Sequence, residues 1–370
     1  MPKLTDALDV KGLHLGNRLV MAPMVTGMAV DHAPSDAQIA WYAGHPRSGV
    51  AMVVVEAAAV APDGLLMACS LGAWDDAQVP GLARLAAAIR AEGVPAVLQI
   101  VHGGAKAWRA DPMAERIGPS AVHLLPAPAP RAMTEAEIQE AIAAFAGAAR
   151  RVKAAGFDGV EIHAAHYYLL SEFLSPYSNH RTDRWGGDVA GRARLAVEVV
   201  KAVRAEVGED FPISCRMHST ENLPGGLSTE DAIHIAQALV AAGVDLIDAS
   251  GIGSSSMGEW RGHPFLNSSS VLPKGDNAGS FGPSAGRIRA AVRVPVITVG
   301  KLSGPGLAQR VLDQGQADLV ALARPLIADP QVADKLLTGR DGEVVRCEEC
   351  LACFNAIRKG PIHCSVNKDL

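Results

Sequence analysis

Short runs of β-branched and apolar residues alternate with longer, alanine-rich segments along most of the 370-residue chain. This alternation is typical of parallel βα units, because each parallel strand needs a crossover, usually a helix, to reach the next strand. Eight strand-like runs can be counted, at 18–23, 50–57, 95–101, 159–164, 212–217, 245–250, 295–300 and 317–323. Eight such units in a chain of this length favour a closed (β/α)8 barrel, the TIM barrel, over an open doubly wound α/β sheet.

The segments between these runs carry helical patterns, among them 81–93, 134–156, 228–243 and 303–315. Two of these segments begin with Thr134 and Ser228, and each of these residues is followed three residues later by a carboxylate, which predicts capped helix starts. Two half-sized α/β domains are the alternative arrangement, but no linker rich in proline or serine separates two halves. We therefore expect one barrel over residues 1–340 and a separate extension over 341–370.

The segment 253–283 is rich in glycine and polar residues and shows no regular pattern. It follows the sixth predicted strand, where a barrel of this type carries loops on its catalytic face. Long segments without secondary structure are more often functional than idle. We therefore expect an irregular loop that shapes the binding site, with a disordered insertion as the alternative.

The composition restricts the classes of partner. Lys and Arg number 34 against 39 Asp and Glu, and the formal net charge of −5 is too balanced to favour a nucleic acid or an anionic membrane. The first residues lack a basic stretch followed by an apolar one, and no apolar run approaches the length of a membrane span. Cys69 and Cys215 stand alone in apolar surroundings, so we expect packed core thiols. Together these features predict a cytoplasmic protein.

The other four of the six cysteines lie together near the end of the sequence. Cys347, Cys350 and Cys353 follow one another at three-residue spacing, and Cys364 comes eleven positions later. Closely spaced cysteines can turn their thiolates inward around an iron–sulfur cube, which a distant fourth ligand then closes. A zinc site, favoured by His363, and a disulfide are the alternatives. We expect an iron–sulfur cluster, and therefore electron transfer, in this extension.

The residues at the end of the fourth predicted strand are the best candidates for catalysis. If the chain forms a barrel, its active site lies at the carboxyl ends of the strands. His163, His166 and Tyr168 follow one another there, in the sequence EIHAAHYYLL. Two imidazoles three residues apart can donate hydrogen bonds to one oxygen, and the phenol can deliver a proton nearby. A single histidine would more often be structural, but the group of three favours a functional role.

The sequence resembles the old yellow enzyme family along essentially its whole length. The segment 161–187 resembles the family signature, and further matching segments are NRLVMAPM (17–24), LQIVHGG (98–104), PVITVGKL (295–302) and ADLVALARPLIADP (317–330). With the cysteine segment and the terminal CSVN, the chain is most similar to the N-terminal barrel portions of 2,4-dienoyl-CoA reductase and trimethylamine dehydrogenase. Those proteins carry flavin mononucleotide (FMN) beside a [4Fe–4S] cluster. The resemblance therefore implies both cofactors, with the four cysteines as cluster ligands.

The resemblance also implies where the flavin is held. Gln99 would face the pyrimidine ring, and Arg216 would bring positive charge to its N1 and O2 side, where reduced flavin accumulates negative charge. The cofactor-binding residues so implied are Pro23, Met24, Val25, Ala57, Gln99 and Arg216, with Gly300, Lys301, Ala323 and Arg324 at the phosphate. A core amide, a turn and a surface salt bridge are the structural alternatives for Gln99, the glycine and the arginine. Val25 stands where many relatives have a cysteine or threonine, so the FMN should be bound non-covalently.

The resemblance implies a reaction as well. In ene reductases of this family, hydride leaves flavin N5 for the β-carbon of an activated alkene, and a tyrosine protonates the α-carbon. Tyr168 occupies the position of that tyrosine, while His163 and His166 would hold the carbonyl oxygen. The substrate would be a small α,β-unsaturated carbonyl compound or an enoyl or dienoyl thioester. Ala57 and Ile357 occupy positions where a methylated ammonium would need aromatic rings, which disfavours amine oxidation.

The sequence is compatible with two sources of electrons for the flavin. The cluster-bearing relatives continue with flavin and pyridine-nucleotide domains, and this sequence contains no GxGxxG fingerprint, so we expect the chain to act without such domains. Either a separate reductase, ferredoxin or electron-transfer subunit supplies electrons through the cluster, or NAD(P)H reduces FMN directly at the barrel mouth. We favour the external donor, because four cysteines beside FMN make sense as a one-electron relay.

Two other functions stay open in the sequence. The first is an oxidative N-demethylase that passes electrons from FMN through the cluster to a partner. The second is a non-catalytic barrel subunit of an electron-transfer complex, although such a scaffold would not need the set of His163, His166 and Tyr168. Members of the family often pair, so a homo-oligomer is compatible with the resemblance.

Overall fold

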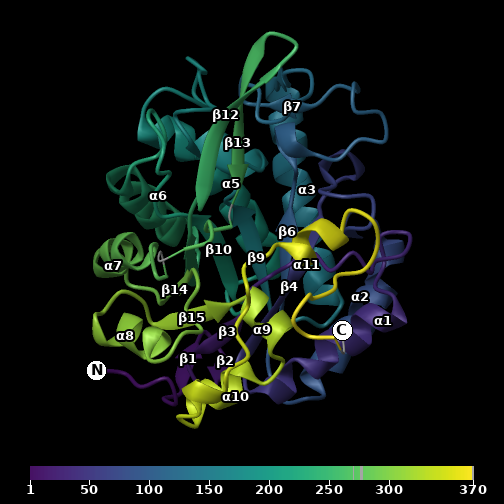
Figure 1. Ribbon diagram of the computed structural model, residues 1–370. Helices are drawn as coiled ribbons and strands as arrows, with labels where there is room; N and C mark the ends of the chain where they lie inside the picture. Colours follow the sequence, from purple (N-terminus) through teal and green to yellow (C-terminus); the bar gives the residue numbers. More distant parts are fainter. Residues whose placement is uncertain (270, 276–277, 369–370) are drawn as a thin grey trace.

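The structure is a computed structural model that describes residues 1–269, 271–275 and 278–368. In these residues eight parallel strands pair in chain order, and the last pairs with the first, so that they close into a barrel (Figure 1). The barrel strands are β3 (Leu19–Met21), β4 (Met52–Ala59), β6 (Ala96–Val101), β9 (Gly159–Ala164), β10 (Ile213–His218), β11 (Leu246–Ser250), β14 (Val296–Val299) and β15 (Leu319–Leu322). The predicted TIM barrel is therefore confirmed, and each strand lies within or close to its predicted range.

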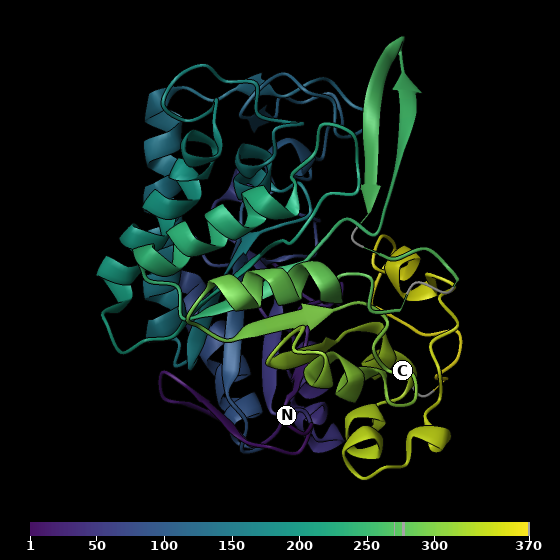
Figure 2. The same ribbon diagram turned by 90° about the vertical axis from the view of Figure 1, so that its left-hand side faces the viewer.

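Helices connect consecutive strands and cover the outside of the barrel (Figures 1 and 2). The connecting helices are α1 (Asp36–Gly44), α2 (Val79–Arg90), α3 (Glu135–Ala154), α5 (Val189–Val207), α6 (Thr229–Ala242), α7 (Gly282–Ala291) and α8 (Leu307–Asp313). Shorter helices are α4 (Leu169–Leu174), α9 (Arg324–Ala328), α10 (Val332–Leu337) and α11 (Ala352–Ala356).

The helix starts follow local sequence signals. Thr134 and Ser228 cap α3 and α6 as predicted, because their side chains accept hydrogen bonds from backbone amides of the first turn. Helix α8 begins later than the predicted start at 303, since Gly306 adopts a left-handed conformation (φ 66°) immediately before it.

The N-terminal end of the barrel is closed by apolar packing. The small hairpin of β1 (Leu8–Val10) and β2 (Leu13–Leu15) places Leu13 and Leu15 in one cluster with Val20 and Val97 of the barrel strands. A larger apolar core fills the space between the strands and the surrounding helices. Three two-residue strands complete the fold: β5 (Leu71–Gly72) pairs with barrel strand β4, while β7 (Ile117–Gly118) and β8 (Arg131–Ala132) pair with each other. Because apolar side chains close this end, a site for a ligand must lie at the opposite end.

The segment 253–283 contains regular structure where we predicted an irregular loop. Strands β12 (Ser254–Trp260) and β13 (His263–Ser269) form an antiparallel hairpin that projects from the barrel (Figures 1 and 2). Arg261 and Gly262, both at positive φ (51° and 80°), make the two-residue turn that such a hairpin favours. The prediction failed because β12 is largely exposed and β13 fully buries only Leu266, so neither strand shows the alternation of a half-buried strand. Residues 270 and 276–277 of the segment lie outside the described residues.

The C-terminal segment, residues 344–368, packs against the barrel beside the loop after β3. Ile362 donates its amide to the carbonyl of Thr26 at 2.7 Å, and Ile357 and Ile362 share an apolar cluster with Ile327 of α9. The segment is drawn in yellow, with α11 in front of the barrel, in Figure 1. In the part of the chain that the structure describes, no helix combines the length and apolar character needed to cross a membrane.

Candidate active site

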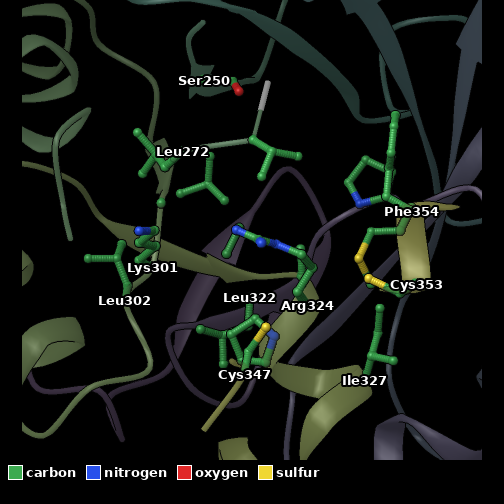
Figure 3. Close-up of a pocket in the computed structure, with 18 of the residues that line it drawn as sticks. Ser250, Leu272, Lys301, Leu302, Leu322, Arg324, Ile327, Cys347, Cys353 and Phe354 are labelled. Carbon is green, nitrogen blue, oxygen red and sulfur yellow. The ribbon is translucent and has the colours of Figure 1, made fainter. Parts of the chain in front are cut away.

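A cavity of about 500 Å³ lies at the carboxyl ends of the barrel strands, a size typical of small-molecule sites (Figure 3). The side chains or backbone of every predicted flavin-binding residue line it, namely Pro23, Met24, Val25, Ala57, Gln99, Arg216, Gly300, Lys301, Ala323 and Arg324. His163, His166 and Tyr168 line the same cavity. Cys347 and Cys353 also line it, whereas Cys350 and Cys364 do not. The fold therefore brings the predicted flavin and catalytic residues into one space.

The strand register places Gln99, Glu161 and Ser214 side by side on β6, β9 and β10. Gln99 donates its Nε2 to Glu161 Oε1 at 2.8 Å, and Ser214 donates its hydroxyl to Glu161 Oε2 at 2.9 Å. Burial raises the pKa of the Glu161 carboxyl, and the nearby carboxyl of Asp248 raises it further. The Nε2 group of Gln99 donates to Glu161, so the amide oxygen of Gln99 is the atom available to accept an N–H from a ligand.

Arg216 lies one layer closer to the mouth, level with His163 and Asp248 on the neighbouring strands. Its guanidinium lies 3.4 Å from Asp248 Oδ2, and both side chains are buried. Within the described residues, Arg216 Nε and Asp248 Oδ1 have no hydrogen-bond partner. A buried donor without a partner is costly, so the guanidinium suits an electronegative group of a bound ligand.

The three catalytic candidates surround one corner of the cavity. The His163 ring centroid lies 5.0 Å from those of both His166 and Tyr168, in edge-on orientations. Burial lowers the pKa values of His163 and His166 well below the usual value, and the charge of Arg216 contributes to both shifts. Burial raises the pKa of Tyr168 to about 12. At neutral pH the site therefore presents two neutral imidazoles and a protonated phenol.

The turn between β9 and α4 holds these groups in place. His166 and Tyr167 both adopt positive φ (64° and 55°), which is uncommon for residues other than glycine. His166 donates its amide to His218 Nε2 at 2.6 Å, and the Tyr167 hydroxyl donates to Glu221 Oε2 at 2.8 Å. The two acceptors are themselves joined, since His218 Nδ1 lies 2.9 Å from Glu221 Oε1. This buried network stabilises the left-handed turn that directs His166 and Tyr168 toward the cavity.

Sequence reasoning missed three residues of this region: His218, Glu221 and Ser250. His218 and Ser250 end strands β10 and β11, so their position at the mouth of a predicted barrel is a signal that could have identified them. Glu221 lies in the loop after β10, where the local sequence gives no such signal.

At the end of the cavity where the phosphate is expected, the side chain of Lys301 does not have the contacts that the prediction requires. Lys301 was predicted to hold the phosphate, but its ammonium donates to the carbonyls of Pro273 and Gly275 and to Glu349 Oε2 at 2.7 Å. Arg324 extends into the middle of the cavity, between Lys301 and the segment of Cys353 (Figure 3). Its Nη1 atom is buried without a hydrogen-bond partner among the described residues. Arg324, together with the backbone at 300–301, is therefore the better candidate for binding a phosphate.

The four predicted cluster ligands lie in one segment but are not gathered around a common point. Among the described residues, no group of three or more His, Cys, Asp or Glu side chains is arranged to hold a metal ion. The Cys350 thiol lies 2.9 Å from the Ser365 hydroxyl, and the amide of Val366 donates to the Cys364 sulfur at 3.4 Å. Thiols are nevertheless the donors that iron–sulfur clusters use, so the donor set fits chemically while its arrangement would have to change on binding.

The two isolated cysteines behave as ordinary thiols. Cys215 is buried in β10, and burial raises its pKa. Cys69 is half-buried, and its thiol donates to the carbonyl of Ile357 at 3.7 Å. Cys215 agrees with the prediction of packed core thiols, whereas Cys69 is only partly buried and contacts the C-terminal segment instead of lying in the core.

Comparisons with known proteins point to one family. The profile of the family described as NADH:flavin oxidoreductase / NADH oxidase matches residues 3–343. The chain is 36% identical over 373 residues to a "metal reductase" of Desulforamulus reducens, covering 100% of this chain and 54% of that protein. It is 35% identical over 332 residues to an NADPH dehydrogenase of Halalkalibacterium halodurans, covering 89% of this chain and 92% of that protein.

A solved structure shows the same architecture. The complex of a 2-naphthoyl-CoA reductase with 2-naphthoyl-CoA has a TM-score of 0.87 and 29% sequence identity to this chain. The match covers 99% of this chain and 57% of that one. The chain thus spans about half the length of both the metal reductase and the naphthoyl-CoA reductase.

Proposed function

The chain belongs to the NADH:flavin oxidoreductase / NADH oxidase family, and we propose that it binds FMN non-covalently in the cavity at the barrel mouth. The unpartnered Nη1 of Arg324 suits the phosphate, and the unpartnered Nε of Arg216 suits the pyrimidine side of the ring. The Gln99 amide oxygen would accept an N–H of the pyrimidine. Val25 has no thiol, so no covalent bond to the flavin forms there.

We propose that the reaction is reduction of the C=C bond of an α,β-unsaturated carbonyl compound or an enoyl or dienoyl thioester. Bound FMN would supply the hydride. His163 and His166 would donate hydrogen bonds to the substrate carbonyl oxygen and stabilise the negative charge that develops on it. Tyr168 would deliver a proton to the α-carbon, since its high pKa keeps the phenol protonated at neutral pH.

One observation carries this proposal: two neutral imidazoles and one phenol line the same corner of the cavity. The Tyr168 hydroxyl has no hydrogen-bond partner among the described residues, whereas the hydroxyl of the neighbouring Tyr167 donates to Glu221. A phenol whose proton is not engaged by the protein is available to a substrate. The two neutral imidazoles can donate hydrogen bonds to a substrate oxygen, and the protonated phenol can give a proton to a substrate carbon.

We also propose that Cys347, Cys350, Cys353 and Cys364 bind a [4Fe–4S] cluster that exchanges electrons with a separate carrier. Cys347 and Cys353 line the cavity, which would bring a cluster close to the flavin. Four basic side chains near the cysteines are exposed, and no described acidic side chain pairs with them: Arg346, Arg358, Lys359 and Lys368. This charge favours an acidic one-electron carrier, such as a ferredoxin or an electron-transfer subunit, as partner.

Anaerobic purification tests the cofactors. We expect about one FMN and four iron atoms per chain, as the proposed [4Fe–4S] composition requires. Replacing Cys347 by Ser should remove the iron and leave FMN bound, while Cys69→Ser, which changes a thiol outside the set, should keep both. A preparation without flavin after incubation with FMN would contradict the proposal.

Turnover assays distinguish alkene reduction from amine oxidation, and they distinguish reduction by a nucleotide from reduction by ferredoxin. The reduced protein should be reoxidised by cyclohexenone or by an enoyl-CoA and not by an N-methylated amine. Slow flavin reduction by NADH and NADPH, together with fast reduction by reduced ferredoxin, is expected if electrons enter through the cluster. Rapid stoichiometric bleaching of FMN by either nucleotide would instead show direct reduction.

A further inference from the structure

Ser250 ends strand β11 and lines the cavity next to His166. Its Oγ lies 2.9 Å from Nε2 of His166, and the residue is buried. Ser219 holds the end of the strand, because its amide and hydroxyl both donate to the Ser250 carbonyl, at 2.7 and 2.9 Å. The Ser250 hydroxyl therefore lies within hydrogen-bond distance of His166 Nε2, on a strand end whose backbone is held by Ser219. Figure 3 places Ser250 at the edge of the cavity.

The neighbouring His163 has a defined tautomer. Its Nδ1 accepts the amide of Ala165 at 3.3 Å, so in the neutral ring the proton must be on Nε2. Within the described residues Nε2 has no partner, and the ring lines the cavity. His163 is therefore an N–H donor toward a ligand.

His166 has two possible neutral tautomers, and the 2.9 Å contact between its Nε2 and Ser250 Oγ suits either of them, with opposite direction of the hydrogen bond. Its ring is kept neutral by burial and by the nearby His163, Arg216 and other basic groups. If Nε2 carried the proton, it would donate to Ser250, and the lone pair of Nδ1 would be directed at any ligand atom beside it. If Ser250 donates to Nε2 instead, the proton is on Nδ1 and the ring can donate. The described residues offer Nδ1 no partner of their own.

We propose that the Ser250 hydroxyl donates to Nε2 of His166 and thereby holds this imidazole in its Nδ1–H form, as a positioning residue for the second N–H donor of the site. Both imidazoles then direct N–H groups toward the cavity, each held in its tautomer by a donor on its other nitrogen. The use of these donors to bind a substrate carbonyl rests on the proposed function, but the tautomer itself does not.

Long-range ¹H–¹⁵N spectra of protein labelled in histidine report the tautomer directly. The signals of His166 are assigned from a His166→Gln variant. We expect a pyrrole-type Nδ1 and a pyridine-type Nε2 in the wild-type protein, a shift toward the Nε2–H form in Ser250→Ala, and restoration in Ser250→Thr, which keeps a hydroxyl. A wild-type Nε2–H tautomer, or spectra unchanged by Ser250→Ala, would overturn the proposal.

Binding of cyclohexanone, a ketone without a C=C bond to reduce, then tests the use of the donors. Loss of one neutral hydrogen bond should weaken cyclohexanone binding about tenfold in Ser250→Ala. Ser255→Ala, on the exposed face of β12, should not change it, and equal thermal unfolding midpoints would show that both variants are folded. If the tautomer depends on Ser250 but the wild-type protein does not bind the ketone, the positioning role stands and the proposed carbonyl site fails. If Ser250→Ala binds as tightly as wild type while its tautomer has changed, the donor role of His166 is wrong.

Discussion

Two adjacent tyrosines have opposite environments, and this difference decides which one can act in catalysis. Tyr167 is fully buried, and its hydroxyl is held by Glu221. Tyr168 lines the cavity, and in the described part of the chain its hydroxyl has no partner. A proton donor must reach the substrate and must not be committed to a structural bond, so Tyr168 meets the requirement and Tyr167 does not.

We predict that Tyr168→Phe slows alkene reduction by about 100-fold or more, the usual contribution of a general acid. Flavin reduction should change less than about twofold, because no proton from Tyr168 is needed in that half-reaction. Anaerobic stopped-flow absorbance measures both steps separately. Tyr177→Phe, whose hydroxyl contacts Met257 of the hairpin, is the matched control and should leave both rates unchanged. Equal losses in the two half-reactions would remove the proton-donor role.

Glu56 is a buried carboxyl that the proposed reaction does not use. Its Oε1 accepts hydrogen bonds from the amide and hydroxyl of Thr26 and from Gln38, while Oε2 has no described partner. Burial raises its pKa from 4.5 to about 7, although the hydrogen bonds of Thr26 and Gln38 oppose the shift. As pH rises above 4.5, the unfolded chain loses this proton before the folded protein does. The folded state therefore binds more protons between these values, and its stability falls as pH rises toward 7.

We predict that Glu56→Gln removes this loss of stability. The free energy of unfolding of the variant relative to wild type should increase by up to about 3 kcal/mol between pH 4.5 and 8, since each pKa unit corresponds to about 1.4 kcal/mol. Urea unfolding at several pH values measures the difference. A wild-type minus variant difference that does not change with pH would show that Glu56 titrates normally in the folded protein.

At the level of elements, the turn between β9 and α4 depends on a network that comes from another loop. Glu221, in the loop after β10, accepts hydrogen bonds from Tyr167, Ser175 and the amide of Leu227, and lies beside His218. Burial alone would raise the pKa of Glu221, but these hydrogen bonds, led by that of His218, hold it below the usual value. A single carboxylate thus connects the turn that carries His166 and Tyr168 to the next βα loop.

We predict that Glu221→Ala lowers the free energy of unfolding by about 3 kcal/mol, because several buried donors lose their acceptor at once. Alkene reduction should fall as well, since the turn that directs His166 and Tyr168 is no longer held. Urea unfolding and steady-state rates measure the two effects. Glu259→Ala, an exposed carboxylate on β12, is the control and should change stability by less than about 0.5 kcal/mol. Equal effects of the two substitutions would show that the network contributes little.

The elements differ in how well the sequence predicts them, for physical reasons. The barrel strands are buried on both faces, so their apolar runs are distinct, and a strand end predicts a place at the mouth. This placed the His163 group at the mouth, whereas Gln99 and Arg216 were predicted from the family resemblance. Hairpin strand β12 is largely exposed, and β13 fully buries only Leu266, so neither strand has a clear two-residue period. The left-handed turn at 166–167 contains no glycine, and its stabilising partner Glu221 is distant in sequence, so neither could be predicted locally.

At the level of the whole molecule, the C-terminal segment completes the cavity that the barrel begins. Ile357 and Cys353 line the cavity together with Met24 and Val25 from the loop after β3. Lys301, after β14, binds Glu349 of the cysteine segment and two carbonyls after the hairpin. Any movement of the cysteines toward a common cluster would therefore be transmitted to the residues around the flavin site. The proposed cofactors are coupled through these contacts even though their ligands come from different parts of the chain.

Gly27, in the loop after β3, lies directly against the backbone of this segment. It adopts a φ of 71°, and a Cβ atom there would lie 2.6 Å from the carbonyl oxygen of Gly360, closer than real Cβ atoms approach. Gly12 has a similar φ of 87°, but a Cβ there would meet no atom within 4 Å. Alanine at either position introduces the same backbone strain, of about 1 kcal/mol, and only Gly27→Ala adds a collision with the segment.

We predict that Gly27→Ala displaces the C-terminal segment from the barrel, whereas Gly12→Ala does not. Trypsin should then cleave after Arg358 and Lys359 several-fold faster in Gly27→Ala than in Gly12→Ala or wild type, because cleavage requires the segment to leave the surface. Iron content should fall in the same variant, since displaced cysteines cannot be held beside the barrel. Circular dichroism of both variants should match that of the wild type, as the barrel itself is unaffected. Equal cleavage rates in the two alanine variants would show that the contact at Gly27 does not hold the segment in place, and the coupling between the cysteines and the cavity would then have to act through the other contacts, those of Lys301 and of Ile362 with Thr26.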